Sequence, residues 1–304
     1  MIEVKHLDKS FGDLHILKDI STNIEKGEKV VIIGPSGSGK STFLRCLNRL
    51  EQPSDGQIFF EGEDLTHMPD RQLYSVRQKM GMVFQHFHLF PHLTIQKNIT
   101  LAPVKLKRMT QAEADAKATE LLQKVGLADK ANQYPDQLSG GQKQRIGIAR
   151  ALALEPKLII CDEAVSALDV SVQAQVLNLL QELKERLGLT YFFISHNLNV
   201  VYQVSDRVGV MYLGKMVEIA AYDQLYEKRY HPYTEALLSA IPQVDADDRT
   251  ERIHLTGEVP SPSDPPSGCP FHTRCPKACD ICSKEIPQLK EIEKGHFVAC
   301  HLYQ

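Results

Sequence analysis

This sequence of 304 residues lacks long apolar runs, a marked excess of either charge, and internal repeats. No stretch approaches the roughly 20 apolar residues that a membrane-spanning helix requires, and we expect no signal peptide in the first residues. The formal net charge is only −3, and no basic run occurs, which argues against wholesale binding of nucleic acid. We therefore expect a cytoplasmic protein that touches a membrane only through partners.

The composition predicts one main folded domain with an appendage. Hydrophobic residues make up 42% of the chain and charged residues 24%, so a chain of this length can bury a sizeable core. Residues 259–268 are rich in proline, which removes backbone donors and fixes φ, so we expect a linker there. The predicted organisation is a main domain over residues 1–240 and an extension over residues 241–304.

A glycine-rich loop near the N-terminus has the pattern of a phosphate-binding loop. It follows the apolar run 30–33, which suits a strand, and precedes residues 43–47, which suit a helix. Glycines let backbone N–H groups turn toward phosphates, Lys40 reaches the β- and γ-phosphates, and Ser41 offers a hydroxyl to Mg²⁺. The residues expected to bind the nucleoside triphosphate are Gly34, Pro35, Ser36, Gly37, Ser38, Gly39, Lys40, Ser41 and Thr42.

Two further stretches carry groups that suit nucleotide chemistry. The apolar run 158–161 ends in two carboxylates, of which Asp162 can hold Mg²⁺ and Glu163 can polarise the attacking water. Ser139, Gly140, Gly141 and Gln142 open an expected helix, where exposed N–H groups form a second anion site. Taken alone, this last string is equally typical of an ordinary helix cap.

Hydrophobic periodicity predicts an α/β fold with an antiparallel part and a helical part. Short alternating strands are expected at 2–7, 20–24 and 56–60. A helical stretch over 94–125 contains the capping-box pattern from Thr110 to Glu113. Apolar strands at 158–161, 191–194 and 208–212, with a helix over 172–187, indicate a buried parallel sheet.

Together, the three motifs resemble the ATP-binding subunit of ATP-binding-cassette (ABC) transporters, over essentially the whole chain. The resemblance implies a P-loop ATPase core with an antiparallel β-part, a helical subdomain over about residues 86–140, and ATP hydrolysis coupled to solute import. Two subunits pair head to tail in this family, as a homo- or heterodimer, so that Ser139 and Gly141 act on the ATP of the opposite subunit. Implied partners are two membrane-spanning permease subunits and, indirectly, an extracytoplasmic substrate-binding protein.

The same resemblance assigns roles to four single residues. Phe11 stands where an aromatic ring stacks on adenine, and Gln85 where a glutamine senses Mg²⁺ and the attacking water. Asp169 falls on the loop that links the two sites of a pair, and His196 on a histidine that contacts the γ-phosphate. The catalytic set is then Glu163, His196, Gln85 and Lys40, and Mg²⁺ is held by Ser41, Gln85 and Asp162.

The likeness to importers divides between two substrate classes. Residues 10–15, 34–40 and 82–92 look like polar amino-acid importers, whereas 162–171, 231–234 and the tail from Pro260 resemble dipeptide and oligopeptide importers. The tail is the more restricted feature, so we favour peptides and keep amino acids as the alternative. Exporters share the catalytic residues but not this tail. Soluble ABC proteins that act on ribosomes or DNA are a less favoured alternative, since the translation factors among them usually carry two cassettes in one chain, whereas this chain has one P-loop and one signature.

The tail concentrates five of the seven cysteines: Cys269, Cys275, Cys279, Cys282 and Cys300. In a cytoplasmic protein such clustering favours metal over disulfides. The spacing of Cys269, Cys275, Cys282 and Cys300 resembles the four-cysteine set that holds a [4Fe–4S] cluster in some peptide-importer ATPases. Zinc, with help from His272 or His301, and unligated thiols are the alternatives.

Overall fold

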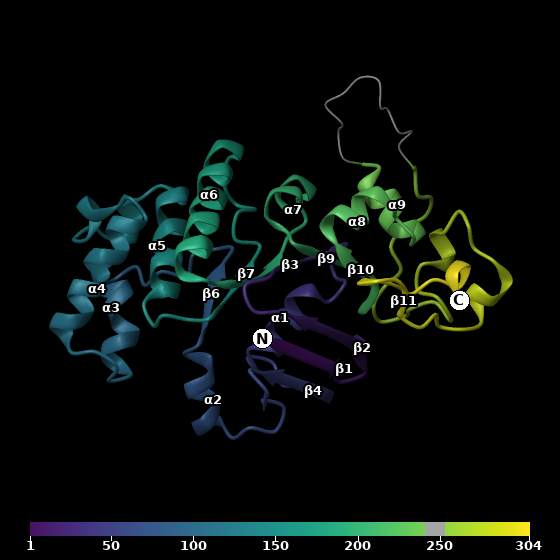
Figure 1. The fold of residues 1–304 in the computed structure, drawn as a ribbon, viewed down its shortest axis with the longest axis horizontal. Helices are drawn as coiled ribbons and strands as arrows, with labels where there is room; N and C mark the ends of the chain where they lie inside the picture. The colour runs from purple at the N-terminus through teal and green to yellow at the C-terminus, as the bar shows by residue number, and fades with distance from the viewer. Residues whose placement is uncertain (241–252) are drawn as a thin grey trace. The chain divides into compact units, whose positions relative to one another are not determined.

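The computed structural model describes residues 1–240 and 253–304 (Figure 1). The chain divides into two compact units. The first unit comprises residues 1–25, 29–67 and 195–304, and the second comprises residues 26–28 and 68–194. Residues 253–304 of the expected extension therefore fold with the N-terminal strands. The predicted boundary at residue 241 lies outside the described residues.

An antiparallel sheet opens the first unit, in the strand order β2-β1-β4-β5 (Figure 1). Its strands are β1 (Ile2–Phe11), β2 (Leu14–Ile24), β4 (Asp55–Phe60) and β5 (Glu63–Asp64). Ile2, Val4 and Leu7 are buried along β1, because a pleated strand directs alternate side chains to one face, with a register shift between Val4 and Leu7. The predicted antiparallel part is confirmed, with longer strands than expected.

A second sheet of the first unit carries the glycine-rich loop. Its neighbouring strands are β11 (Lys290–Glu293), β12 (His296–Val298), β10 (Lys215–Ala221), β9 (Arg207–Tyr212) and β3 (Lys29–Ile33). Strands β3 and β9 are parallel, and their apolar side chains are buried. The unit's helices are α1 (Lys40–Leu47), α7 (Leu198–Val204), α8 (Tyr222–Glu227) and α9 (Pro232–Leu238).

The second unit contains the parallel strands expected from the apolar runs. They are β6 (Met80–Phe84), β7 (Leu158–Asp162) and β8 (Thr190–Ile194), with Phe84 opposite Asp162 and Asp162 opposite Ile194. All three strands point the same way, so their carboxyl ends share one edge. The helices α2 (Asp70–Arg77), α5 (Gly140–Leu152) and α6 (Val170–Leu187) belong to the same unit.

The helical part predicted over residues 86–140 contains α3 (Ile95–Lys105) and α4 (Gln111–Lys124). Thr94 caps α3 by accepting the N–H of Lys97. The predicted capping box at α4 is present, since Thr110 accepts the N–H of Glu113 while the Glu113 carboxylate accepts the N–H of Thr110. Two 3₁₀ turns, at Ala128–Lys130 and Pro135–Gln137, lead to α5.

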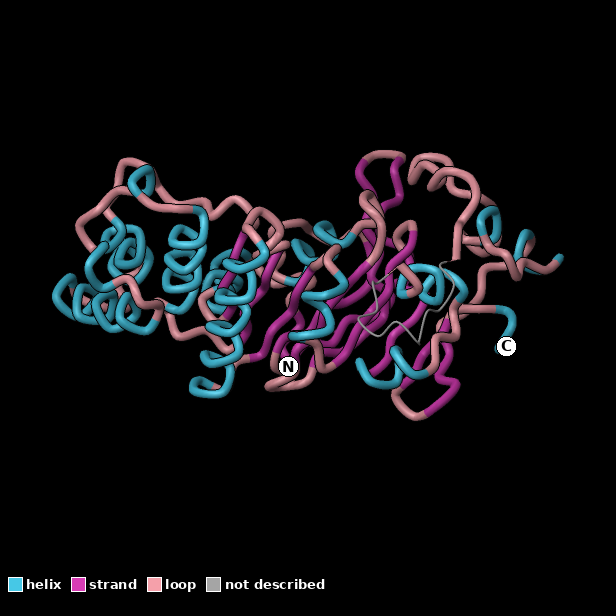
Figure 2. The backbone as a smooth tube through the Cα atoms, turned by 90° about the horizontal axis from the view of Figure 1, so that it is seen from above, coloured by secondary structure: helices cyan, strands magenta, loops and turns pink. Residues whose placement is uncertain are grey.

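The extension folds back on the second sheet of its unit. Residues 253–268 form no helix or strand, in agreement with the predicted linker, and Figure 2 shows the chain near the C-terminus mostly as loop with short helical turns. Phe271 is fully buried between Tyr212 of β9 and Tyr233 of α9, with ring centroids 5.3 Å from each. Strand β12 then pairs with β10, so the extension becomes part of the sheet.

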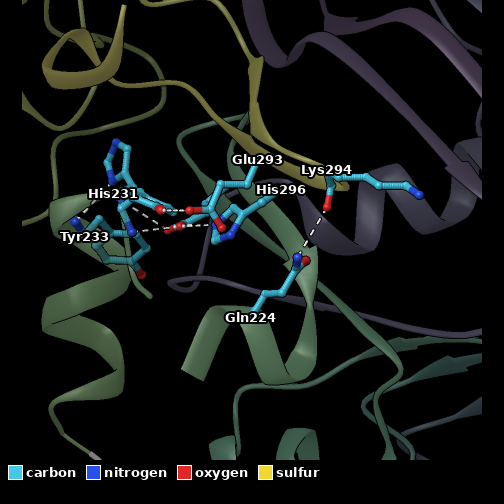
Figure 3. A network of polar contacts seen from close by, with 8 residues as sticks. Gln224, His231, Tyr233, Glu293, Lys294 and His296 are labelled. Carbon is cyan, nitrogen blue, oxygen red and sulfur yellow. Dashed lines mark hydrogen bonds and ion pairs between the residues drawn. The ribbon is translucent and has the colours of Figure 1, made fainter. Parts of the chain in front are cut away.

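A buried polar network joins the extension to β10 (Figure 3). The Glu218 carboxylate, fully buried on β10, accepts the backbone N–H groups of Tyr230 and His231 at 2.9 and 3.1 Å. His296 of β12 is also fully buried and bonds the same carboxylate through Nε2 at 2.8 Å. Near the surface, Glu293 accepts a hydrogen bond from the Tyr230 hydroxyl at 2.6 Å.

Throughout the part of the chain that is described, no helix has the length and apolar character to span a bilayer.

Candidate functional site

The glycine-rich loop connects β3 to α1 in the first unit, as the sequence predicts. Lys40 is the first residue of α1, and its ammonium donates to the carbonyl oxygens of Gly34 and Pro35, both at 2.9 Å. Lys40 is nearly buried, with 7% of its surface exposed, so its charge is directed at the loop backbone. Gly39 precedes it in the left-handed conformation, which glycine adopts without steric cost. The loop therefore encloses an ammonium group at a helix N-terminus.

The hairpin between β9 and β10 supports this loop. The Gly214 N–H donates to the Ser38 carbonyl at 3.0 Å, and the Gly214 carbonyl accepts the N–H of Lys18 from β2 at 2.9 Å. A Cβ at Gly34 would lie 2.2 Å from the Met211 carbonyl oxygen, so the hairpin also packs against the start of the loop. Sequence reasoning missed this support. A glycine at position 214, directly after an apolar strand, is the signal that predicts such a turn.

Two other predicted residues belong to the same unit. Phe11 ends β1 with 45% of its surface exposed, and the Lys9 ammonium lies 4.3 Å from the centre of its ring. His196 is exposed, and the neighbouring Ser195 donates its N–H to the Ile32 carbonyl of β3 at 3.3 Å. His196 thus lies beside the strand that leads into the glycine-rich loop, although it is far from Lys40 in the sequence.

In the second unit, the structure brings Gln85, Asp162 and Glu163 to one edge of the sheet. Gln85 follows β6 and Glu163 follows β7, and Phe84 and Asp162 are register partners in the parallel ladder. The three side chains are half-buried. Glu163 has φ of 50°, and its N–H donates to the Ile194 carbonyl of β8 at 3.2 Å. Carboxylate and amide oxygens at a sheet edge are ligands that suit Mg²⁺.

The segment after Gln85 is held by α5. Arg150 donates from its two terminal nitrogens to the carbonyl oxygens of His88, at 2.5 Å, and Phe87, at 3.0 Å. Phe87 and His88 both have positive φ, so this turn follows an uncommon backbone path that the arginine stabilises. Burial lowers the pKa of Arg150 below its ordinary value, because the charged guanidinium loses solvent.

The predicted second anion site begins α5. Ser139 is the exposed N-cap: its hydroxyl accepts the N–H of Gln142 at 3.4 Å, and the Gln142 side chain accepts the N–H of Ser139 at 3.0 Å. A Cβ at Gly141 would lie 2.4 Å from a methyl carbon of Val172, so α5 packs closely on α6 at this point. Asp169, the exposed residue before α6, makes no side-chain cap bond.

The cysteines of the extension gather in space. The pKa values of the Cys269 and Cys300 thiols are raised to about 11, first by burial and in part by the charges of Cys275 and Cys282. The sulfur atoms of Cys279 and Cys282 are 3.4 Å apart. Within residues 1–240 and 253–304, however, no group of three or more His, Cys, Asp or Glu side chains is placed to hold a single metal ion.

Two family models match the chain. Residues 17–166 match the model described as ABC transporter, which covers the glycine-rich loop, Gln85, Ser139 and Glu163. Residues 217–282 match the model described as oligopeptide/dipeptide transporter, C-terminal region. The second match includes the buried Glu218 and Cys269, Cys275, Cys279 and Cys282 of the extension.

Curated relatives extend over nearly the full length. The oligopeptide transport ATP-binding protein AppF of Bacillus subtilis is 51% identical, over 97% of this chain and 92% of its own. A putative peptide import ATP-binding protein of Brucella ovis is 48% identical, over 97% of this chain and 94% of its own. The putative oligopeptide transport ATP-binding protein YkfD of Bacillus subtilis is also 48% identical, over 100% of this chain and 96% of its own.

Solved structures match about three quarters of the chain. A dimeric, post-hydrolysis state of the ATP-binding cassette MJ0796 bound to ADP and Pi has a TM-score of 0.67 and 35% identity, and it covers 73% of this chain and 98% of the cassette. A second dimeric structure of that cassette has a TM-score of 0.67 and 36% sequence identity, with the same coverage. With the motifs and the C-terminal region taken together, the chain belongs to the ABC transporter ATP-binding proteins that carry the oligopeptide/dipeptide C-terminal region.

Proposed function

We propose that this chain is the ATP-hydrolysing subunit of a membrane importer that takes up dipeptides and oligopeptides. The observation that carries the proposal is the C-terminal region at residues 217–282, joined to a cassette whose relatives of near-equal length are oligopeptide or peptide transport proteins. The amino-acid alternative rests on short stretches such as residues 82–92, which comprise the end of β6 and part of the loop that follows it. A whole-chain likeness outweighs those stretches.

The glycine-rich loop is proposed to bind the phosphates of ATP. The observed bonds from Lys40 to the Gly34 and Pro35 carbonyls hold the ammonium inside the loop, and a phosphate oxygen competes for the same donor. The loop's N–H groups and the α1 terminus add positive potential. Phe11 has an exposed ring suited to stacking on adenine, and His196 is proposed to contact the γ-phosphate.

Hydrolysis is proposed to use the sheet edge of the second unit. Mg²⁺, when bound, neutralises charge that develops on the phosphates, and the oxygen atoms of Asp162, Gln85 and Ser41 are of the kind it prefers. Glu163 is proposed to accept the proton of the attacking water. Its backbone is fixed between β7 and the Ile194 carbonyl, so its carboxylate is held in place by the sheet.

A second ATP-binding subunit, identical or homologous, is proposed to complete each site. Ser139 is exposed at the start of α5. The capping box satisfies the N–H groups of Ser139 and Gln142, whereas those of Gly140 and Gly141 have no acceptor within the helix. Asp169 and its neighbour Val170, which is 82% exposed, lie at the start of α6. We propose that Ser139 and Gly141 bind the γ-phosphate of the opposite subunit, with Asp169 at the contact.

Two permease subunits are proposed as the membrane partners, which places the chain as a peripheral protein on the cytoplasmic face of the cell membrane. The turn after Gln85 exposes His86, His88 and Phe90 on the surface. Arg150 ties this turn to α5, the helix that begins with Ser139. A change in what Ser139 contacts can therefore move the turn and the permease bound to it.

For the cysteine cluster we propose a [4Fe–4S] cluster held by Cys269, Cys275, Cys282 and Cys300. Zinc needs four ligands around one ion, and sulfur atoms bound at 2.3 Å to zinc lie about 3.8 Å apart. A cluster binds each thiolate to a separate iron, so its sulfurs stand farther apart. The charges of Cys275 and Cys282 raise the pKa values of Cys269 and Cys300, so these four thiols lie near one another, as the ligands of one cluster do.

The transport proposal is tested by reconstitution in liposomes. The chain is combined either with membrane subunits of a peptide importer or with those of a polar amino-acid importer, each with its loaded binding protein. We expect ATPase stimulation only with the peptide set. Stimulation only with the amino-acid set would mean that residues 82–92 determine the partner and that the peptide assignment is wrong.

The metal proposal is tested by purification without oxygen, followed by iron, acid-labile sulfide and zinc analysis. We expect about four iron atoms and four sulfides for each chain, as a [4Fe–4S] cluster contains. Cys275→Ser should lose the cluster, whereas Cys279→Ser, a matched change in the same extension, should retain it. Stoichiometric zinc, or no metal, would overturn the assignment.

A further inference from the structure

A cavity of about 350 Å³ lies inside the first unit, between β2, the β9–β10 hairpin and the extension. One wall carries charged and polar groups from β1, β2 and β10, and the other carries apolar groups from the extension. Its lining residues include Lys18, Asp19, Lys215, Leu289 and Phe297. None of the nucleotide motifs lines it, so the cavity is separate from the proposed ATP-binding residues.

Two lysines converge on this cavity without a carboxylate partner. Lys18 and Lys215 are half-buried, and in the described part of the chain neither forms an ion pair within 4.0 Å. Burial and the charge of Lys215 lower the pKa of Lys18. Burial also lowers the pKa of Lys215, although the charges of Asp19 and Asp8 oppose that shift. Two half-buried ammonium groups that line one cavity favour an anion there.

The two carboxylates whose charges reach Lys215 each form a hydrogen bond with a histidine. Asp19 pairs with His6 at 2.7 Å, and Asp8, whose charge also reaches Lys215, pairs with His15 at 2.6 Å. Both stand near the lysines without contacting them. Asp19 is the one carboxylate among the described residues that line the cavity, so the two lysines leave an excess of positive charge there for a ligand.

The walls indicate which anion fits. Phosphate sites typically use glycine-rich loops, helix N-termini or arginine forks, and no arginine or glycine is among the described residues that line this cavity. The extension instead supplies an apolar wall, which includes Ile286, Leu289 and Phe297. A volume of 350 Å³ lies within the range of small-molecule sites, about 300–1,000 Å³. An organic acid with an apolar body matches both walls.

We propose that this cavity binds a small organic carboxylate, with its charged end between Lys18 and Lys215 and its apolar body against the extension. Lys18 also donates its N–H to Gly214, whose own N–H holds Ser38 of the glycine-rich loop. Two backbone hydrogen bonds, from Lys18 to Gly214 and from Gly214 to Ser38, therefore connect the residue that binds the acid to the proposed phosphate-binding loop. This proposal goes beyond ATP hydrolysis and does not depend on which solute is transported.

Methyl NMR of the nucleotide-free full chain tests the proposal. Met216 lines the cavity, so its ¹³C-labelled methyl signal, assigned with a Met216→Leu variant, reports on this site. We expect hexanoate to shift that signal saturably. Hexanamide, which has the same shape without the charge, should bind at least about tenfold more weakly, because charge-assisted hydrogen bonds are lost.

Variants separate the role of charge from that of fold. Lys18→Gln and Lys215→Gln should each weaken hexanoate binding by about tenfold or more, while the ligand-free melting temperature stays level or rises because repulsion is relieved. Lys5→Gln, on β1 outside the cavity, should leave hexanoate affinity unchanged. Equal affinities for hexanoate and hexanamide, unchanged affinities in both lysine variants, or binding of inorganic phosphate but not hexanoate would overturn the proposal.

Discussion

Glu163 has a backbone conformation that residues other than glycine seldom adopt. Its φ is 50°, directly after the last residue of β7, and its carbonyl accepts both the N–H and the hydroxyl of Ser166, at 3.1 and 2.9 Å. Strained backbone of this kind costs of order 1–3 kcal/mol and persists where the surroundings fix it. The sheet and the following turn fix it here, which agrees with a carboxylate that must keep one position.

We predict that Glu163→Gln leaves ATP binding intact and slows hydrolysis by about 100-fold or more, because an amide cannot accept the proton of the attacking water. We also expect ATP to trap the variant as a dimer. The ATPase rate measures hydrolysis, nucleotide titration measures binding, and size-exclusion chromatography with ATP measures dimer formation. Lys40→Ala is the comparison, since it should weaken nucleotide binding itself. Rapid turnover in Glu163→Gln would remove Glu163 from the role of base.

His231 makes folding stability depend on pH. It is fully buried, and loss of solvent lowers its pKa from 6.5 to about 4, although the charge of Glu218 opposes the shift. Below pH 6.5 the unfolded chain takes up a proton on this histidine, whereas the folded chain does not until about pH 4. The free energy of unfolding should therefore fall as the pH drops through this window.

The expected loss from this residue is about 3 kcal/mol between neutral pH and pH 4. Urea unfolding at several pH values measures it. His231→Asn is the control, because asparagine can still accept the Tyr233 N–H that His231 Nδ1 accepts at 3.1 Å, yet it does not titrate. An identical pH profile in wild type and variant would show that other groups cause the acid sensitivity.

At the scale of elements, the β9–β10 hairpin supports the glycine-rich loop through the hydrogen bond from Gly214 to Ser38. Gly214 has φ of 81°, and a Cβ there would lie 2.1 Å from the Ile16 carbonyl oxygen. We predict that Gly214→Ala shifts the hairpin away from β2, loosens the bond to Ser38, and weakens ATP binding. Titration with a fluorescent ATP analogue and thermal unfolding measure the two consequences.

Gly62 provides a matched control for that change. Its φ is 84°, close to that of Gly214, but nothing lies within 4 Å of an added Cβ. Gly62→Ala should cost only the backbone strain of positive φ, about 1 kcal/mol, and should leave ATP affinity unchanged. Equal effects of the two substitutions on affinity would contradict a supporting role for the hairpin.

At the scale of the whole molecule, the extension is attached through groups far apart in the sequence. Glu218 and His296 are fully buried and bonded at 2.8 Å, although they are 78 residues apart. We predict that His296→Ala destabilises the folded protein by about 3 kcal/mol, because a buried carboxylate loses a partner and a cavity forms. Limited proteolysis should then cleave the extension before the rest of the chain.

The exposed pair of the same network is the control. Lys228 and Glu293 are 2.8 Å apart with side chains 59% and 38% exposed, and solvent screens such pairs. Glu293→Gln should leave the free energy of unfolding almost unchanged, because water screens an exposed ion pair. If His296→Ala and Glu293→Gln lowered the free energy of unfolding equally, the buried pair of Glu218 and His296 would not be what attaches the extension.

The sequence by itself determined the parts whose chemistry is local. The glycine-rich loop from Gly34 to Thr42 needs its residues in unbroken order, so the pattern alone predicts it. The capping box at Thr110 and the apolar strand 158–161 are likewise properties of a few neighbouring residues, and both are present. The spacing of cysteines in the tail is also visible in the sequence, but the ion that it holds remains a prediction.

Only the tertiary structure decided which distant residues meet. Glu218 is a single acidic residue within an apolar run, and nothing local predicts that it is buried against donors from the residues just before α9 and from β12. Lys18 and Lys215 line one cavity because β2 and the β9–β10 hairpin are bonded through Gly214. The reason is physical: helix caps and phosphate loops are fixed by short-range bonds, whereas burial and charge pairing depend on where the whole chain returns.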